Sequence, residues 1–396
     1  MSAYARAALG VSVLLFLVVG DVWFPRGSPW LALRVPLLAA GAVASLVLVA
    51  LRPSLLRPLA RPPLIFFVAF AALDLLAGAM AEHPLLSLRY AFGYFVVVLT
   101  AAVVGGVFSD RVLMRGLTAT LVVKIALSLA FVSQPWAWWF GRRLQGGLGS
   151  PNPMGATAGL AYLLLLVQGW YDWRTPAARA VQSGAGLAAT VALALTHSVS
   201  AAVATVGTLA VAAPLGRLRK DTWKARFAWL AVAAALLAPL VLVGNRGAGQ
   251  ATGRMVTPTR ALELRLEWWG MLVPVVLQRP WFGYGAGSTA ALAVPGSPQW
   301  GTSAHNLYLE AAIYAGIPAA LAMLLFVAAA VFMSSRRALG EADAARTGVA
   351  AVLIFYAVLS LVEPVVLNGM PSSLLVPLVA AAMIVREDPG GHEGRR

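Results

Sequence analysis

Residues 306–333 read NLYLEAAIYAGIPAALAMLLFVAAAVFM and contain a single charged residue, Glu310. A helix that crosses the hydrocarbon core of a bilayer needs about 20 consecutive, mostly apolar residues. This stretch exceeds that length and therefore predicts a membrane-spanning helix.

Apolar runs of this kind recur along the whole chain. The sequence is 60% hydrophobic and only 11% charged, whereas soluble domains carry about 25% charged residues. We therefore predict an all-α polytopic membrane protein with about 12 transmembrane helices. The first run lacks a small-residue cleavage site, which indicates a retained helix. Besides 306–333, the runs lie near 7–24, 30–51, 64–81, 87–107, 116–134, 153–170, 181–197, 200–216, 227–244, 347–364 and 372–386.

The basic residues predict the orientation of these helices. The formal net charge of +15 would suggest nucleic acid in a soluble protein, but here most of the excess lies in short loops between apolar runs. Short basic loops mark the cytoplasmic side of an inner membrane. Both termini are therefore expected in the cytoplasm, with membrane lipids rather than nucleic acid as partners. These loops hold Arg52, Arg57, Arg61, Arg111, Arg115, Arg174, Arg179, Arg217, Arg219, Lys220, Lys224, Arg226, Arg336, Arg337 and Arg346.

One long segment divides the chain into three parts. Residues 1–244 hold nine predicted transmembrane helices, 245–305 form a large periplasmic loop, and 306–396 hold three more helices and a cytoplasmic tail. Within the loop, RALELRLEWWGMLVPVVLQRPW at 260–281 has an amphipathic pattern rich in Trp. Such a pattern favours a helix that lies in the membrane interface.

Several arginines fall on the predicted outer face, where positive charge is normally depleted. Arginine fits phosphate oxygens with two parallel hydrogen bonds, so a cluster suits an anionic ligand. Alternatively, these side chains reach lipid headgroups or pair with Glu263 and Glu267. The residues concerned are Arg142, Arg143, Arg246, Arg254, Arg260, Arg265 and Arg279.

Two of these arginines differ in their local surroundings. Arg260 and Arg265 lie about 140° apart on a helix, so both are not expected to face one pocket. Arg260 can pair with Glu263, three residues on. Arg265 has no acidic residue three or four positions away, so it is expected to be the freer of the two.

His305 begins the predicted helix at 306–333, with Thr302 or Ser303 as its expected cap. In a first turn the positive helix end favours neutral imidazole, which can accept a proton from a sugar hydroxyl. A purely structural histidine is the alternative interpretation. The sequence has no Cys and no His/Asp/Glu group with ligand spacing, so we expect no metal site and no cofactor. Asp74 and Lys124, inside predicted helices, are either functional or a buried pair.

Four sequence patterns between residues 140 and 320 resemble those of the O-antigen ligase and polymerase family. They appear in the family's order and at its spacing, although each is weak alone. They are Arg265, Trp269, Pro280, Gly283 and Gly285; His305-Asn306 with Gly316; Arg260-x3-Leu264; and Arg143-Leu144-x-Gly146 with Pro151-Asn152.

This resemblance implies a GT-C-like glycosyltransferase that moves O-antigen glycan from undecaprenyl pyrophosphate to lipid A-core in the periplasm. It implies that Arg265 binds the pyrophosphate and that His305 activates the acceptor hydroxyl. The expected substrate-binding residues are Arg142, Arg143, Arg260, Trp269 and Asn306.

The turn at 196–200 departs from the family pattern, because it lacks the Arg that often stands there. Three alternatives stay open. A polymerase would use a second lipid-linked glycan as acceptor, and a protein O-oligosaccharyltransferase would use a protein. A 12-helix secondary transporter would show internal repeats and midplane charges, and no such repeats are visible.

Overall fold

The fold is almost entirely helical in a computed structural model that describes residues 9–10, 13, 34–139, 143–148, 150–172, 175–215, 258–288, 303–340, 343–363, 367 and 371–386. The α-helices are α2 (Arg34–Leu51), α3 (Leu64–Ala79), α4 (Pro84–Val107), α5 (Asp110–Ala130), α6 (Pro151–Asp172), α7 (Pro176–Thr196), α8 (Val199–Leu215), α10 (Pro258–Gln278), α11 (Leu307–Gly340), α12 (Ala344–Ser360) and α13 (Pro371–Val385). Short elements complete the list: η2 (Pro53–Ala60), η3 (Pro135–Ala137), β1 (Trp138–Trp139), β2 (Arg143–Leu144) and η4 (Gly146–Leu148).

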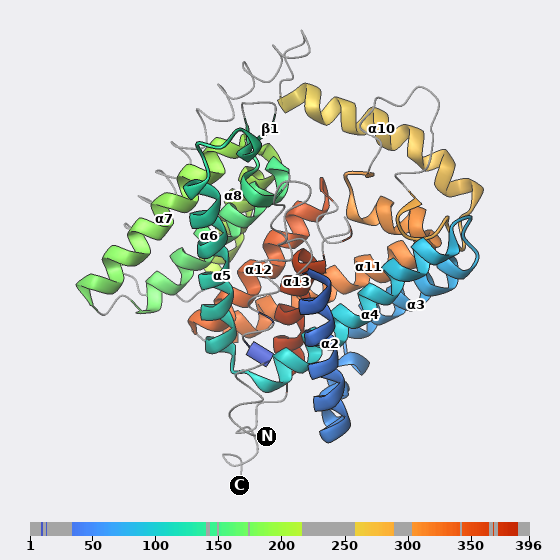
Figure 1. Ribbon diagram of the computed structural model, residues 1–396, viewed down its shortest axis with the longest axis horizontal. Coiled ribbons are helices and arrows are strands. Elements are labelled where there is room, and N and C mark those ends of the chain that lie inside the picture. The colour runs from blue at the N-terminus through green and yellow to red at the C-terminus, as the bar shows by residue number, and fades with distance from the viewer. Residues whose placement is uncertain are drawn as a thin grey trace.

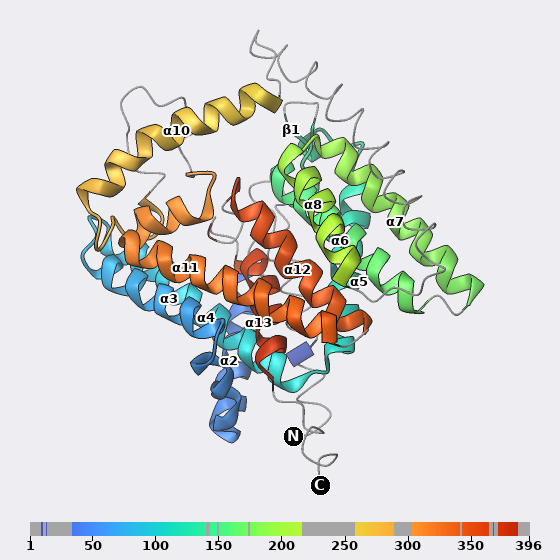
Figure 2. The same cartoon turned by 180° about the vertical axis from the view of Figure 1, so that it is seen from behind.

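The helices form two groups with a central pair between them. Helices α3, α4 and α11 lie on one side, and α5, α6, α7 and α8 lie on the other (Figures 1 and 2). Helix α12 packs against α6, α8 and α11, while α13 packs against α4 and α12. Helix α10 lies across one end of this arrangement in both views.

The helices agree with the apolar runs of the sequence. Ten of the twelve predicted runs contain a helix, while 227–244 and most of 7–24 lie outside the described residues. Four helices, α4, α5, α7 and α11, are long and apolar enough to cross a membrane, and α2 with η2 makes a fifth if that pair, bent by 105°, is one span. Helices α3, α8, α12 and α13 are apolar but shorter. The chain is therefore a multi-pass membrane protein, and the number of twelve spans stays a prediction.

The amphipathic helix predicted at 260–281 is present as α10. Trp268 on this helix is buried and Trp269 is partly buried, while Leu262 and Leu266 are exposed. The helix thus turns one Trp-bearing face onto the protein and leaves apolar side chains outside. This pattern is that of a helix lying in an interface.

The chain after α10 is locked onto a bend in α11. The N–H groups of Tyr284 and Gly285 donate to the carbonyls of Ile313 and Tyr314, both at 2.8 Å, and the N–H of Ile317 donates to Pro280 O at 2.7 Å. The bend itself lies at Gly316, where φ is 82° and ψ is 178°. Glycine is required at Gly283, Gly285 and Gly316, because a Cβ at any of these positions would lie 2.5 Å from a neighbouring atom.

Asp74 and Lys124 are both buried, in α3 and α5. Neither carboxylate oxygen of Asp74 has a hydrogen-bond partner among the described residues. A hydrogen-bonded Asp74–Lys124 pair is therefore not present.

Gly316→Ala should destabilise the protein. The backbone conformation at this position is essentially restricted to glycine and costs other residues roughly 1–3 kcal/mol, and the new Cβ would lie 2.5 Å from the carbonyl of Trp281. A lowered thermal unfolding temperature in detergent would show this. Gly184→Ala, in α7 with no atom within 4 Å of its Cβ, is the control and should be neutral or slightly stabilising. Equal stability of the two variants would contradict a strained bend at Gly316.

Candidate functional site

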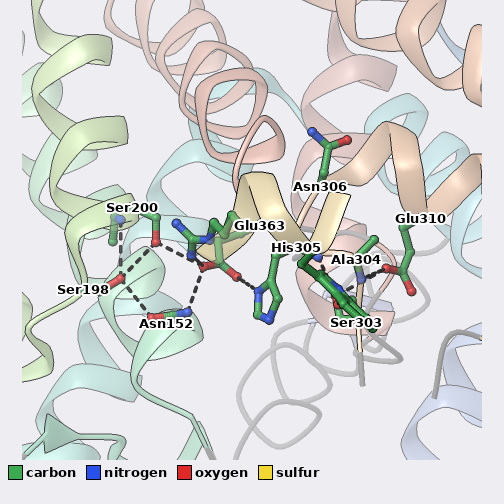
Figure 3. A network of polar contacts seen from close by, with 12 residues as sticks. Asn152, Ser198, Ser200, Ser303, Ala304, His305, Asn306, Glu310 and Glu363 are labelled. Atoms are coloured by element: carbon green, nitrogen blue, oxygen red, sulfur yellow. Dashed lines mark hydrogen bonds and ion pairs between the residues drawn. The ribbon is translucent and has the colours of Figure 1, made fainter. Parts of the chain in front are cut away.

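A buried carboxylate, that of Glu363, lies at the centre of a polar network (Figure 3). Glu363 follows α12, and its backbone N–H donates to Leu359 O at 2.8 Å. One carboxylate oxygen accepts from Nη2 of Arg265 at 2.5 Å, and the other lies 3.3 Å from Nδ1 of His305. Glu363 therefore joins the two residues that the sequence singled out, which come from α10 and from the turn before α11.

The same carboxylate is held from the opposite side by the other helix group. Nδ2 of Asn152 donates to Glu363 at 2.8 Å, and the hydroxyl of Ser200 donates to it at 3.4 Å. Ser198 donates to Asn152 Oδ1 at 3.3 Å. Because Asn152 begins α6 and Ser200 begins α8, the network spans both helix groups.

Arg143 joins this network through Asn152. Its guanidinium donates to Asn152 Oδ1 at 3.2 Å and to the carbonyls of Thr196 and His197 at 2.9 and 3.3 Å. Burial lowers the pKa of Arg143, and Glu363 counteracts that effect. The turn at 196–200, which lacks the expected Arg, thus supplies backbone acceptors that orient Arg143.

The backbone of His305 is fixed by the residues around it. His305 has a φ of 51°, and its N–H donates to Ser303 Oγ at 3.1 Å. The indole N–H groups of Trp268 and Trp269 donate to the carbonyls of Ser303 and Ala304 at 3.1 and 2.8 Å. Two neighbouring tryptophans of α10 therefore hold the segment that carries the histidine.

The carboxylate of Glu310 stabilises this turn through hydrogen bonds. Glu310 is fully buried, and its carboxylate accepts from the Ala304 N–H at 2.5 Å and from the Ser303 hydroxyl at 3.3 Å. The single charge in the first quoted apolar run is thus satisfied by the turn that precedes its helix.

The predicted cap of α11 was wrong. The cap is Asn306, whose Oδ1 accepts from the N–H groups of Tyr308 and Leu309 at 3.0 and 2.9 Å. Its Nδ2 donates to Leu361 O at 3.0 Å, which ties α11 to the chain that carries Glu363. Since α11 begins at Leu307, His305 precedes the first turn, and the carboxylate of Glu363 rather than the helix end acts on its ring directly.

The contact with Glu363 has a chemical consequence for the imidazole. With a proton on Nδ1, the ring donates to the carboxylate, and Nε2 keeps its lone pair. A histidine held in this way can accept a proton from a hydroxyl while the carboxylate stabilises the resulting imidazolium. The His305 side chain is 25% exposed, so its ring is accessible.

The sequence identified Arg265, His305 and Arg143, and the structure brings all three into one network. Arg265, expected to be freer than Arg260, pairs with Glu363, 98 residues further along the chain. Arg142 and the side chain of Arg260 lie outside the described residues. Trp269 holds the backbone beside His305.

Sequence reasoning missed Glu363 and Ser200, and it named Asn152 only as part of a family pattern, without a role in the site. One signal was available, because Glu363 is an acidic residue at the end of the apolar run 347–364, and ionisable residues in membrane segments are functional candidates. Within the described part of the chain, no group of three or more His, Asp or Glu side chains could hold a metal ion. The positive charge of the described site is that of Arg143 and Arg265.

Together these features define a multi-pass membrane protein in which a buried glutamate joins an arginine of the surface helix α10 to a partly exposed histidine. Residues 184–324 match the model of the O-antigen ligase family. This match supports the predicted resemblance to the O-antigen ligase and polymerase family, whose members are glycosyltransferase-like enzymes that act on lipid-linked glycans. No curated protein matches the chain.

Glu363→Gln should reduce stability and release its partners. The amide would place a donor against either Arg265 or His305, which leaves one of them unsatisfied at a cost of roughly 1–3 kcal/mol. Thermal unfolding in detergent measures the change. The control is Glu267→Gln on the exposed face of α10, which should change stability by less than about 1 kcal/mol. If both variants unfold at the same temperature, Glu363 is not central to the network.

A second prediction concerns pH. Burial and the nearby Arg143 lower the pKa of His197, which caps α7 with a φ of 49°. Because the folded state disfavours the proton, this stabilisation is complete above the unfolded pKa of about 6.5 and is lost as pH falls through the lowered folded value. His197→Asn, which tolerates the left-handed backbone, should flatten the stability profile below pH 6.5. An unchanged profile would show that another group titrates.

Proposed function

We propose that this protein is an O-antigen ligase. It transfers O-antigen glycan from undecaprenyl pyrophosphate to lipid A-core at the periplasmic face of the inner membrane, by an inverting, metal-independent displacement. The observation that carries the proposal is the shared contact of Arg265 and His305 with the two oxygens of Glu363, because it places a phosphate-binding cation beside a proton acceptor.

Arg265 neutralises the leaving group in this mechanism. Its side chain is 22% exposed although it pairs with Glu363, so part of the guanidinium remains accessible to a ligand. A pyrophosphate that accumulates negative charge as the glycosidic bond breaks would be stabilised by this fixed cation. Arg143, on the other side of Asn152, adds a second positive charge, and Arg142 and Arg260 are expected to assist.

His305 acts on the acceptor. The acceptor hydroxyl oxygen attacks the anomeric carbon from the face opposite the pyrophosphate, and the bond from that carbon to the phosphate oxygen breaks. The hydroxyl proton passes to Nε2 of His305, and the electron pair of the broken bond leaves with the pyrophosphate. A single displacement of this kind inverts the anomeric carbon.

Three further residues hold this arrangement in place. Glu363 orients the imidazole of His305 and the guanidinium of Arg265 at once. Asn306 fixes the start of α11 against Leu361, and Trp269 fixes the chain at Ala304. In the proposal they position the reacting groups, and an exposed part of Trp269 also packs against sugar.

The charge distribution supports a periplasmic site. The start of α5 and the end of α13 lie at the end of the molecule away from α10 (Figure 1). Arg111 is in the first turn of α5, and Arg386 directly follows α13. Basic loops of this kind are cytoplasmic, so α10 and the network beneath it are assigned to the periplasmic end.

A transfer assay tests the mechanism. Purified protein is incubated with undecaprenyl-pyrophosphate glycan and lipid A-core, with EDTA present. His305→Ala should lower the transfer rate by roughly 10²–10⁴-fold through loss of the general base. Arg265→Lys should lower it by roughly 10²-fold or more, because a point charge cannot replace a bidentate fork. EDTA should have no effect.

Two matched variants control for nonspecific effects. His83→Ala and Arg115→Lys alter exposed residues of the same types and should keep near-normal rates. Normal transfer by Arg265→Lys would refute the pyrophosphate role of Arg265. A second arm offers another lipid-linked repeat unit in place of lipid A-core, and product on that acceptor alone would make the protein a polymerase with the same chemistry.

A further inference from the structure

The end of the molecule away from α10 carries a pocket lined by four arginines, three from separate helices and one that follows a fourth helix. Its cavity volume is about 240 Å³. Four arginines face two aspartates, which gives the lining a formal net charge of +2. They are Arg111 of α5, Arg337 of α11, Arg346 of α12 and Arg386 after α13, with Asp110 and Asp343.

Hydrogen bonds to the backbone orient two of these guanidinium groups. Arg386 donates to Phe108 O at 2.6 Å, and Arg337 donates to the carbonyls of Met383 and Arg386 at 3.2 and 3.3 Å. Arg111 lies 3.6 Å from Asp343. The pocket therefore joins the ends of several helices through arginines whose positions are fixed by the fold, and a guanidinium with five N–H donors still suits a phosphate group.

An apolar groove adjoins this pocket. It lies between α4, α5 and α13, with Gly10 and Val13 also in its lining. Its cavity volume is about 130 Å³, and it is lined almost entirely by apolar surface. Met383 lines both the pocket and the groove. The segment 108–112 also contributes to both: Ser109, Asp110 and Arg111 line the pocket, and Phe108 and Val112 line the groove. Other groove residues include Val104, Leu117 and Val379.

We propose that the pocket and the groove together bind one anionic phospholipid of the cytoplasmic leaflet. The phosphate of the headgroup lies among Arg111, Arg346 and Arg386, and an acyl chain runs from there into the groove past Met383. Charge and shape both favour this ligand, because the positively charged pocket adjoins the apolar groove at Met383. Basic pockets at the cytoplasmic ends of transmembrane helices suit such headgroups. The site is separate from the Glu363 network and independent of the proposed transfer reaction.

Native mass spectrometry of the full chain in mild detergent tests this proposal. The protein is titrated with phosphatidylglycerol and with phosphatidylcholine of identical chains. Phosphatidylglycerol should bind on the order of tenfold more tightly, owing to charge-assisted hydrogen bonds. The double variant Arg111→Gln/Arg346→Gln should lose this preference. Val112→Trp, at a side chain that is 55% exposed, should weaken the binding of both lipids by filling the groove.

The control is Arg115→Gln/Arg336→Gln, which removes the same charge from exposed residues of α5 and α11 that do not line the pocket. It should keep the preference for phosphatidylglycerol. If the control variant loses the preference equally, the preference arises from the overall positive charge of this surface and not from the pocket, which would overturn the proposal. Displacement of the lipid by millimolar inorganic phosphate would also overturn it, because the site would then hold a free anion. Circular dichroism and size-exclusion chromatography verify that each variant is folded.

Discussion

The site depends on one buried carboxylate and on the need to satisfy it. Glu363 is 4% exposed, and a carboxylate left without partners in such a place would cost several kcal/mol. Its partners come from both helix groups: Arg265 and His305 from one side, Asn152 and Ser200 from the other. The contacts that stabilise the Glu363 carboxylate therefore also fix the positions of the Arg265 guanidinium and the His305 imidazole relative to each other. The proposed chemistry uses both groups.

The backbone on each side of His305 is specified as tightly as its side chain. Before His305 in the chain, the carbonyls of Ser303 and Ala304 accept hydrogen bonds from the two tryptophans of α10. After it, Asn306 caps α11 and donates to the carbonyl of Leu361. Further along, the bend at Gly316 accepts the segment that leaves α10. A shift of α10 would therefore move Arg265 and the histidine turn together, which keeps their relative geometry constant.

The two ends of the molecule place arginine in different settings. At the α10 end, Arg143 and Arg265 are held by a buried carboxylate and by carbonyls within a mixed polar network. At the other end, Arg337 and Arg386 are anchored on the backbone at the ends of α4 and α13, beside an apolar groove. The first setting suits a reacting pyrophosphate, whereas the second suits a headgroup that stays bound.

From the sequence alone we predicted a multi-pass membrane protein and the amphipathic helix α10, and the structure agrees with both. We also singled out His305, Arg265 and Arg143, which the structure brings into one network. The length of apolar runs, the distribution of charge and the spacing of motifs are local properties of the sequence, so they can be recognised before the fold is known. The sequence could not show that Arg265 pairs with Glu363, because the two residues lie 98 positions apart. Pairs predicted within one helix are only three or four positions apart. Nor could the sequence place the cap of α11 at Asn306, because Thr302, Ser303 and Asn306 are all competent caps and only the position of the bend and of Leu361 selects among them. Tertiary structure decided which charges meet, because burial of Glu363 from two sides requires helices that are far apart in the chain.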